Sequence, residues 1–191
     1  MTGGWPAVAV RLPDWIDAAV PRGLVVEDPD DRMRLAIELA RRNVEEDTGG
    51  PFGAAIFERD SGRLIAPGVN RVVPARIAVA HAEITAIAIA GQVVGSFTLG
   101  AEGMPPAQLV TSSEPCAMCF GAIPWSGVSS LLCGARASDA EAVGFDEGPK
   151  PRDWASALGD RGIEVVLDVL RDDAVEVLRQ YGASGRPIYN G

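Results

Sequence analysis

Four side chains that could do chemistry together occupy two short segments of the sequence. His81 and Glu83 are two residues apart, and further along the chain Cys116 and Cys119 are three residues apart. An imidazole and two thiols are good zinc ligands, and three protein ligands leave a tetrahedral zinc ion one open position for water. The pKa of such a water can fall toward about 7. The pattern therefore predicts a hydrolytic zinc site in which Glu83 is not a ligand and transfers protons.

The two segments together are more informative than either segment alone. An isolated histidine or C-x-x-C pair has several explanations, whereas H-x-E followed by P-C-x-x-C is a signature of zinc-dependent nucleobase deaminases. A structural zinc site is the alternative, and it would need a fourth protein ligand. Cys133 is the only spare thiol. It lies in an apolar stretch, where a free cysteine usually behaves as a small hydrophobic residue.

Length and composition indicate one globular domain. The chain has 191 residues, of which 47% are hydrophobic and 23% charged, values typical of a domain with a substantial core. A net charge of -9 argues against a nucleic-acid partner, because such proteins usually present a basic face. Three cysteines favour a reducing compartment over a disulfide framework. With neither a signal-peptide pattern nor a membrane-length apolar run, we expect a cytoplasmic protein without a membrane partner.

The chain divides into three expected segments. Residues 1–27 form an irregular arm rich in Gly, Pro and Trp, with one short helix beginning near Pro13. Residues 28–184 form the domain that carries the candidate site. Residues 185–191 form an irregular tail.

Helices and strands alternate along this domain. Asp28 is a suitable N-cap, and apolar spacing predicts a helix that continues to about Gly49. Strands are predicted over 52–58, 64–70, 108–111, 128–133 and 163–169. Further helices are predicted over 82–90, 154–158 and 172–181, and one that opens at Pro115 and carries both cysteines in its first turn. The turn at 60–62 pairs the first two strands as an antiparallel hairpin, so we expect an α/β fold: a mixed sheet with helices on both faces.

Further residues resemble one known family. They are Pro51-Phe52-Gly53-Ala54, Asn70, the segment Ser113 to Cys119, the run from Gly121 to Trp125, and Gly144-Phe145-Asp146-Glu147. Together with His81-Ala82-Glu83 these resemble bacterial guanine deaminases of the cytidine-deaminase-like fold, over about residues 30 to 150. The resemblance implies a three-layer α/β/α sandwich around a five-stranded mixed sheet. It also implies a homodimer whose C-terminal segment can complete the partner's pocket.

The resemblance also suggests substrate contacts. The candidates from the resemblance are Phe52, Asn70, Trp125, Asp146 and Glu147. We also include Ala82, within the first motif, and Tyr189, near the end of the chain, as candidate substrate contacts. Guanine offers O6 and N7 as acceptors and N1-H as a donor, which suit an asparagine amide and a carboxylate respectively. We expect Glu147 to hold the ring and to help bring a proton to the leaving amine. The alternatives are that Asn70 only stabilises a turn, that Glu147 is a solvated charge and that Trp125 is plain core.

The expected reaction is therefore zinc-dependent hydrolysis of guanine, a small-molecule nucleobase, to xanthine and ammonia. An aminated triazine such as ammeline, cytosine or cytidine, and adenosine in tRNA are the alternative substrates. The acidic net charge argues against tRNA. A non-catalytic, zinc-stabilised binding module is the alternative from a different class.

Overall fold

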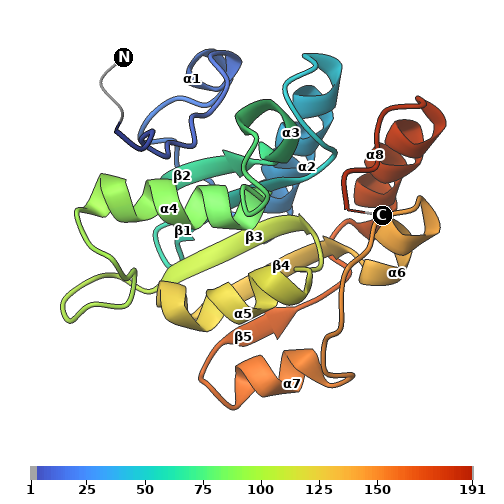
Figure 1. Cartoon of the computed structure of the whole chain (residues 1–191). Coiled ribbons are helices and arrows are strands. Elements are labelled where there is room, and N and C mark those ends of the chain that lie inside the picture. Colours follow the sequence, from blue (N-terminus) through green and yellow to red (C-terminus); the bar gives the residue numbers. More distant parts are fainter. Residues whose placement is uncertain (1–3, 191) are drawn as a thin grey trace.

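The computed structural model describes residues 4–190 of the chain. Its strands are β1 (Gly53–Glu58), β2 (Leu64–Val69), β3 (Ala107–Ser113), β4 (Ser130–Ala135) and β5 (Glu164–Val166). Its helices are α1 (Trp15–Ala19), α2 (Pro29–Glu45), α3 (Val72–Ala75), α4 (Ala82–Val94), α5 (Ala117–Ser126), α6 (Ala137–Ala142), α7 (Trp154–Gly159) and α8 (Arg171–Ala183). Figure 1 shows the sheet between two groups of these helices.

The sheet is mixed, as the alternation of elements predicts. Its strands follow the order β2-β1-β3-β4-β5. The hairpin partner β2 and the central strand β3 both run antiparallel to β1, whereas β3, β4 and β5 are parallel. Residues after parallel strands meet at one edge of a sheet, and this is where α5 begins after β3. The five-stranded mixed sheet within residues 4–190 is confirmed.

Each face of the sheet has its own apolar core because neighbouring side chains on a strand point to opposite faces. Ile56, Leu109 and Leu131 pack with α4, α5 and α7. The residues that follow two of them, Phe57 and Val110, pack instead with α2 and α8. The three layers of helix, sheet and helix are visible in Figure 1, and they confirm the sandwich.

The long helix α2 begins as its sequence predicts. The side chain of Asp28 accepts a hydrogen bond from the Asp30 N–H at 2.7 Å, and Pro29 occupies the first turn. At the sheet, a Cβ on Gly53 would lie 2.2 Å from the Ala36 carbonyl oxygen. A glycine at this position therefore lets α2 approach β1 closely.

The helix that follows His81 is longer than predicted. It continues through Gly91 to Val94 and ends at Gly95, whose φ is 70°. An isolated glycine is tolerated inside a helix, whereas a left-handed glycine is a common end point. The end of α4 therefore corrects the expected end at residue 90.

Other boundaries also differ from the predictions. The chain between β2 and α4 contains the short helix α3, which was not predicted, and the strand expected over 163–169 is reduced to β5. Helix α6 was not predicted, since its six residues are too few to show a helical apolar period. An Asp139 side-chain oxygen accepts from the Arg136 N–H at 2.7 Å and so supports its first turn.

The two terminal segments pack against the domain. Val25 of the expected arm forms an isolated antiparallel bridge with Arg63. In the tail, the Asn190 carbonyl accepts a hydrogen bond from the Asp146 N–H at 3.0 Å. Within the described residues, no helix has both the length and the apolar character needed to cross a membrane.

Candidate active site

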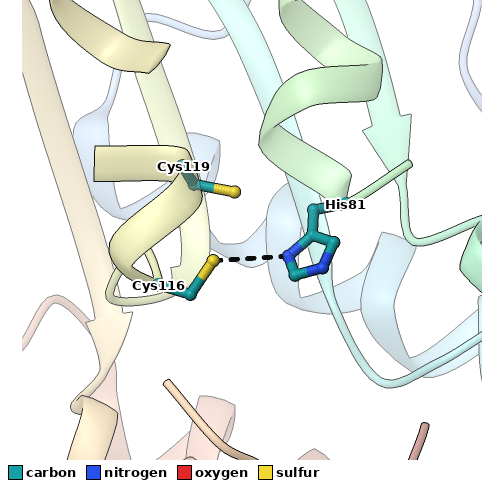
Figure 2. Close-up of side chains that lie close together, drawn as sticks. All are labelled: His81, Cys116 and Cys119. Carbon is teal, nitrogen blue, oxygen red and sulfur yellow. Dashed lines mark hydrogen bonds between the residues drawn. The ribbon is translucent and has the colours of Figure 1, made fainter. Parts of the chain in front are cut away.

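Two helix starts bring three metal-ligand side chains together. His81 is the N-cap residue of α4, Cys116 is the N-cap residue of α5, and Cys119 lies in the first turn of α5. The Cys116 Sγ lies 3.5 Å from the His81 Nδ1 (Figure 2). The ligand atoms of all three lie within 4.8 Å of one another. Cys116 thus precedes the helix instead of belonging to its first turn as predicted.

The donor set suits a catalytic metal ion. One nitrogen and two sulfurs are zinc ligands, and a site with three protein ligands keeps an open position. Cys133, the candidate fourth ligand of a structural site, is fully buried in the apolar core beside Leu131. It does not join the three-residue group within residues 4–190. The arrangement therefore matches the open site that the sequence predicts.

The two thiols differ in acidity. A hydrogen bond from Cys119, together with the bond to His81, lowers the pKa of Cys116 to about 4 despite its burial. The pKa of Cys119 is raised, because its proton is held by Cys116 and because the thiol is buried. The pair therefore holds negative charge on Cys116, where a metal cation would be stabilised. Burial lowers the pKa of His81, but Cys116 and Glu83 outweigh this effect and raise it.

Glu83 lies in the first turn of α4, two residues after the histidine, and its side chain is buried. Burial raises the pKa of Glu83 to about 7, the negative charge on Cys116 adds to the rise, and His81 opposes it. A carboxyl group with a pKa near neutrality can both accept and return a proton. Glu83 is thus suited to proton transfer next to the candidate metal ligands.

A small cavity opens beside these groups. Its lining is Phe52, Asn70, His81, Glu83, Glu114, Cys116, Glu147, Tyr189 and Asn190. The lining comes from two helix starts, the loops around β1 and β2, the segment after α6, and the tail. Seven of these nine residues belong to the set that the sequence predicts for metal binding, catalysis or substrate binding, and Glu114 and Asn190 do not.

Asn70 presents its amide to the cavity in a fixed orientation. Its side-chain oxygen accepts from the Val72 N–H at 3.2 Å, so its Nδ2 remains available to donate. Its backbone N–H donates to the Phe52 carbonyl at 3.1 Å. The turn-stabilising role considered for this residue is therefore present, and it leaves the amide group available for a ligand.

Glu147 lies on the far side of the same cavity and is 5% exposed. Its carbonyl accepts from the Ala117 N–H at 2.8 Å, which joins its segment to the start of α5. Burial raises the pKa of Glu147 to about 8, and the charges of Cys116 and Glu83 add to this effect. The alternative of a solvated surface charge is excluded by this burial.

Aromatic rings form one side of the cavity. Phe52 packs edge-on against Phe145 at 4.9 Å between centroids, and Tyr189 packs against the same ring at 5.3 Å. The Tyr189 hydroxyl and the Asn190 side-chain oxygen are buried and have no hydrogen-bond partner among residues 4–190. The tail thus lines the cavity of its own chain. Asn190 was not predicted, because no local pattern connects a terminal asparagine to a site more than 40 residues away.

Glu114 is a second lining residue that sequence reasoning did not single out. It is 6% exposed and pairs with Arg136 at 3.0 Å and with Lys150 at 3.6 Å. Lys150, the only lysine of the chain, also donates to the Pro115 carbonyl at 2.6 Å. These ionic bonds hold the segment before Cys116. The signal in the sequence was a charged residue placed directly before the P-C-x-x-C motif.

Three expected substrate contacts do not line this cavity in the described chain. The Ala82 side chain is fully buried in the apolar core. Asp146 is exposed, and its side chain accepts from the Gly148 N–H at 2.8 Å. Trp125 is 78% exposed on the outer face of α5. None of these three side chains therefore lines the cavity, Trp125 is not plain core, and their role as substrate contacts stays a prediction.

Comparison with known proteins identifies related chains. Residues 26–135 match the family described as "Cytidine and deoxycytidylate deaminase zinc-binding region". Guanine deaminase from Bacillus subtilis is 40% identical over 115 residues, which are 60% of this chain and 69% of that protein.

Solved structures agree with this similarity. The structure of guanine deaminase from Nitrosomonas europaea is 50% identical, with a TM-score of 0.90 over 95% of this chain and 100% of that one. The structure of NE0047 in complex with 2,6-diaminopurine is 51% identical, with a TM-score of 0.91 over 96% and 97% of the two chains. Both likenesses therefore extend through nearly the whole chain.

Proposed function

The chain belongs to the cytidine and deoxycytidylate deaminase family, and from this premise we propose that it hydrolyses free guanine to xanthine and ammonia. The supporting observation is one cavity that joins the His81, Cys116 and Cys119 group to Glu83, Asn70 and Glu147. The identities of 40% and 50% with guanine deaminases favour guanine. These similarities do not favour ammeline, cytosine, tRNA adenosine or a non-catalytic module.

We propose zinc as the metal, held by His81, Cys116 and Cys119. When bound there, zinc supplies a Lewis acid that makes water a better nucleophile near neutral pH. The three side chains fix its position, and Glu114 with Lys150 anchors the backbone on which Cys116 depends. Chelation should remove both metal and activity, and restored zinc should return both.

Glu83 then moves the protons of the reaction. Its carboxylate accepts a proton from the attacking water as the new C–O bond forms at the carbon that bears the amino group. It passes that proton to the adjacent ring nitrogen, then takes the remaining proton of the new hydroxyl group and delivers it to the amine, so that the C–N bond breaks, the carbonyl group of xanthine forms and ammonia leaves. The pKa of about 7 suits both halves of this exchange.

Asn70 and Glu147 select the base in this proposal. The free Asn70 Nδ2 donates to guanine acceptors, and Glu147 accepts from N1-H, a contact that favours its ionised form against the raised pKa. Adenine has no N1-H and would leave the buried carboxyl unpaired, so it should be rejected strongly. Because its pKa is about 8, Glu147 can also carry a proton to the leaving amine. If Glu147→Gln changed only KM for guanine and left kcat unchanged, this result would contradict the proposed proton-carrying role of Glu147.

A panel of bases tests the substrate. Guanine should release ammonia, whereas cytosine, ammeline and adenosine should release little under the same conditions. The reverse ranking would contradict the proposal. A zinc-loaded protein without activity toward any base would support the binding module instead.

We also propose a homodimer, in a cytoplasmic setting that keeps the ligand thiols reduced. On α5, Met118, Gly121, Ala122 and Trp125 follow the spacing of one helix face. Met118 is 36% exposed and Trp125 78%, and an exposed apolar surface of this kind often marks an interaction site. Trp125→Glu should shift the mass measured by light scattering from dimer to monomer, and a monomeric parent would contradict the dimer.

A further inference from the structure

Asn43 lies outside the cavity and joins two segments of its base-facing wall. This name denotes the side of the cavity lined by Phe52, Asn70, Glu147, Tyr189 and Asn190. Asn43 is fully buried near the end of α2. Its Nδ2 donates to the Gly50 carbonyl and to the Asn70 carbonyl, at 2.9 Å in each case. Gly50 precedes Phe52 by two residues, so one amide group joins the segment that carries the aromatic wall to the segment that presents Asn70.

The orientation of this amide is fixed from its other end. The Asn43 Oδ1 accepts from the Thr48 hydroxyl at 2.9 Å. The Thr48 Oγ1 in turn accepts from the Trp15 Nε1–H at 3.0 Å. Since a hydroxyl has one proton, the bond from the indole leaves that proton for Asn43. Trp15 itself is held by the Arg42 guanidinium, 4.7 Å from the indole ring centroid.

The packing around this amide leaves little room for movement. A Cβ on Gly49 would lie 2.0 Å from the Asn70 carbonyl oxygen and 2.5 Å from the Asn43 Nδ2. Only glycine therefore fits between the two asparagines. A shift of Asn43 that keeps its hydrogen bond to the Asn70 carbonyl would therefore move the backbone of Asn70, whose side chain lines the cavity.

We propose that Asn43 is a positioning residue that sets Asn70 against Phe52, and that the N-terminal arm contributes through Trp15, whose indole N–H donates to Thr48. The proposal depends on the base-binding role proposed above for Asn70. Asn43 does not line the cavity, and it is not one of the candidate metal ligands. Its effect therefore passes through Asn70, and disturbing it should weaken base binding more than proton transfer.

The Thr48 hydroxyl allows the mildest test. Thr48→Val removes the hydroxyl and keeps the shape, so KM for guanine should rise by about 3- to 10-fold while kcat changes less than twofold, a partial loss of positioning. Thr48→Ser restores the hydroxyl and should restore KM. Thr98→Val is the matched control, because Thr98 is also half-buried and its Oγ1 accepts only from the Gly100 N–H, at 3.2 Å, outside the pocket.

Two further variants extend the series. Asn43→Asp places carboxylate oxygen against two carbonyl oxygens and should raise KM by about 10- to 100-fold, as misplaced contacts do. Trp15→Phe removes the indole N–H together with part of the ring and should raise KM by about 2- to 3-fold, since Thr48 can still reach Asn43. If Asn43→Asp does not fold, the Thr48 and Trp15 variants decide the outcome.

Zinc content, circular dichroism and a crystal structure of zinc-loaded Thr48→Val complete the experiment. We expect full zinc, an unchanged spectrum and an Asn70 amide displaced from its parental position. Unchanged KM in folded Thr48→Val, failure of Thr48→Ser to restore KM, or an equal rise in Thr98→Val would overturn the proposal. If the zinc-loaded parent does not act on guanine, the proposed function fails, and the position of Asn70 in the crystal still decides the role of Asn43.

Discussion

The cavity has a metal-facing wall and a base-facing wall that the chain builds in different ways. The metal-facing wall consists of the first residues of α4 and α5, helices that pack directly on the sheet. The base-facing wall consists of Phe52, Asn70, Glu147 and the tail residues Tyr189 and Asn190. The first depends on two short motifs, and the second depends on loops and a terminus brought together from four regions of the chain.

The side chains proposed for the chemical step and those proposed for base recognition therefore depend on different parts of the structure. The side chains proposed to bind metal and move protons are held by helix starts and by the buried Glu114–Lys150 ion pair. Those proposed to contact the base are held by hydrogen bonds between loops, such as the two that Asn43 donates. Changes to the metal-facing wall should therefore abolish the reaction, whereas changes to the base-facing wall should alter which base reacts and how tightly it binds.

The largest effect should come from Glu83→Gln. Without the carboxylate, proton transfer is lost, and kcat for guanine should fall by about 10²- to 10⁴-fold. Steady-state ammonia release measures this loss, and zinc content by mass spectrometry should stay at the parental level. A Glu83→Gln variant with near-parental kcat would contradict the proton-transfer role of Glu83.

Asn70→Ala should have the next largest effect and a different signature. It removes a donor to guanine and leaves the base unpaired there, so kcat/KM should fall by about 10- to 100-fold, mostly through KM. The ratio of guanine to adenine turnover should also fall. Loss of kcat alone, with KM and selectivity preserved, would contradict the division between the two walls.

Lys150→Met tests the support behind the metal-facing wall. Its Nζ bond to the Pro115 carbonyl and its pairing with Glu114 would both be lost. We expect zinc affinity to fall by about 10-fold, as when other outer-sphere contacts of metal sites are removed. Competition with a chelator measures the affinity, and KM for guanine at saturating zinc should change little. A change in KM for guanine without any change in zinc affinity would contradict this role and would indicate that Lys150 supports the base-facing wall instead.

The smallest effect concerns stability and pH in the metal-free protein. The pKa of Glu147 is raised by burial from 4.5 to about 8, so the folded state binds this proton more tightly than the unfolded state. The resulting stabilisation is present below pH 4.5 and is lost as the pH rises toward about 8. Relative to the parent, Glu147→Gln should therefore gain free energy of unfolding between those limits. Urea denaturation across this range measures the difference, and a constant difference would contradict the burial of an ionisable carboxyl.

The sequence predicts the metal-facing wall well because its information is local. His81 and Glu83 share one helix start, and Cys116 and Cys119 share another, so spacing alone places each pair. The alternation of apolar segments likewise predicts a mixed sheet between helices. It does not predict α6 or the end of α4, where short length or one tolerated glycine hides the boundary.

The base-facing wall is harder to predict because it depends on contacts between distant segments. Resemblance to a family pointed to Asn70 and Glu147, which line the cavity, and also to Asp146 and Trp125, which do not line it in the described chain. Asn190 and the buried Asn43 have no local motif at all. Their roles become visible only when the tail and the end of α2 are seen against the loops that they bind.

X-ray absorption at the zinc edge of the purified protein tests the central claim most directly. The account predicts one zinc ion per chain with two sulfur ligands at about 2.3 Å, one imidazole nitrogen and one further light atom from solvent. The spectrum of Cys133→Ser should be the same. A third sulfur ligand that disappears in Cys133→Ser, or a metal-free protein that deaminates guanine at the full rate, would contradict the account.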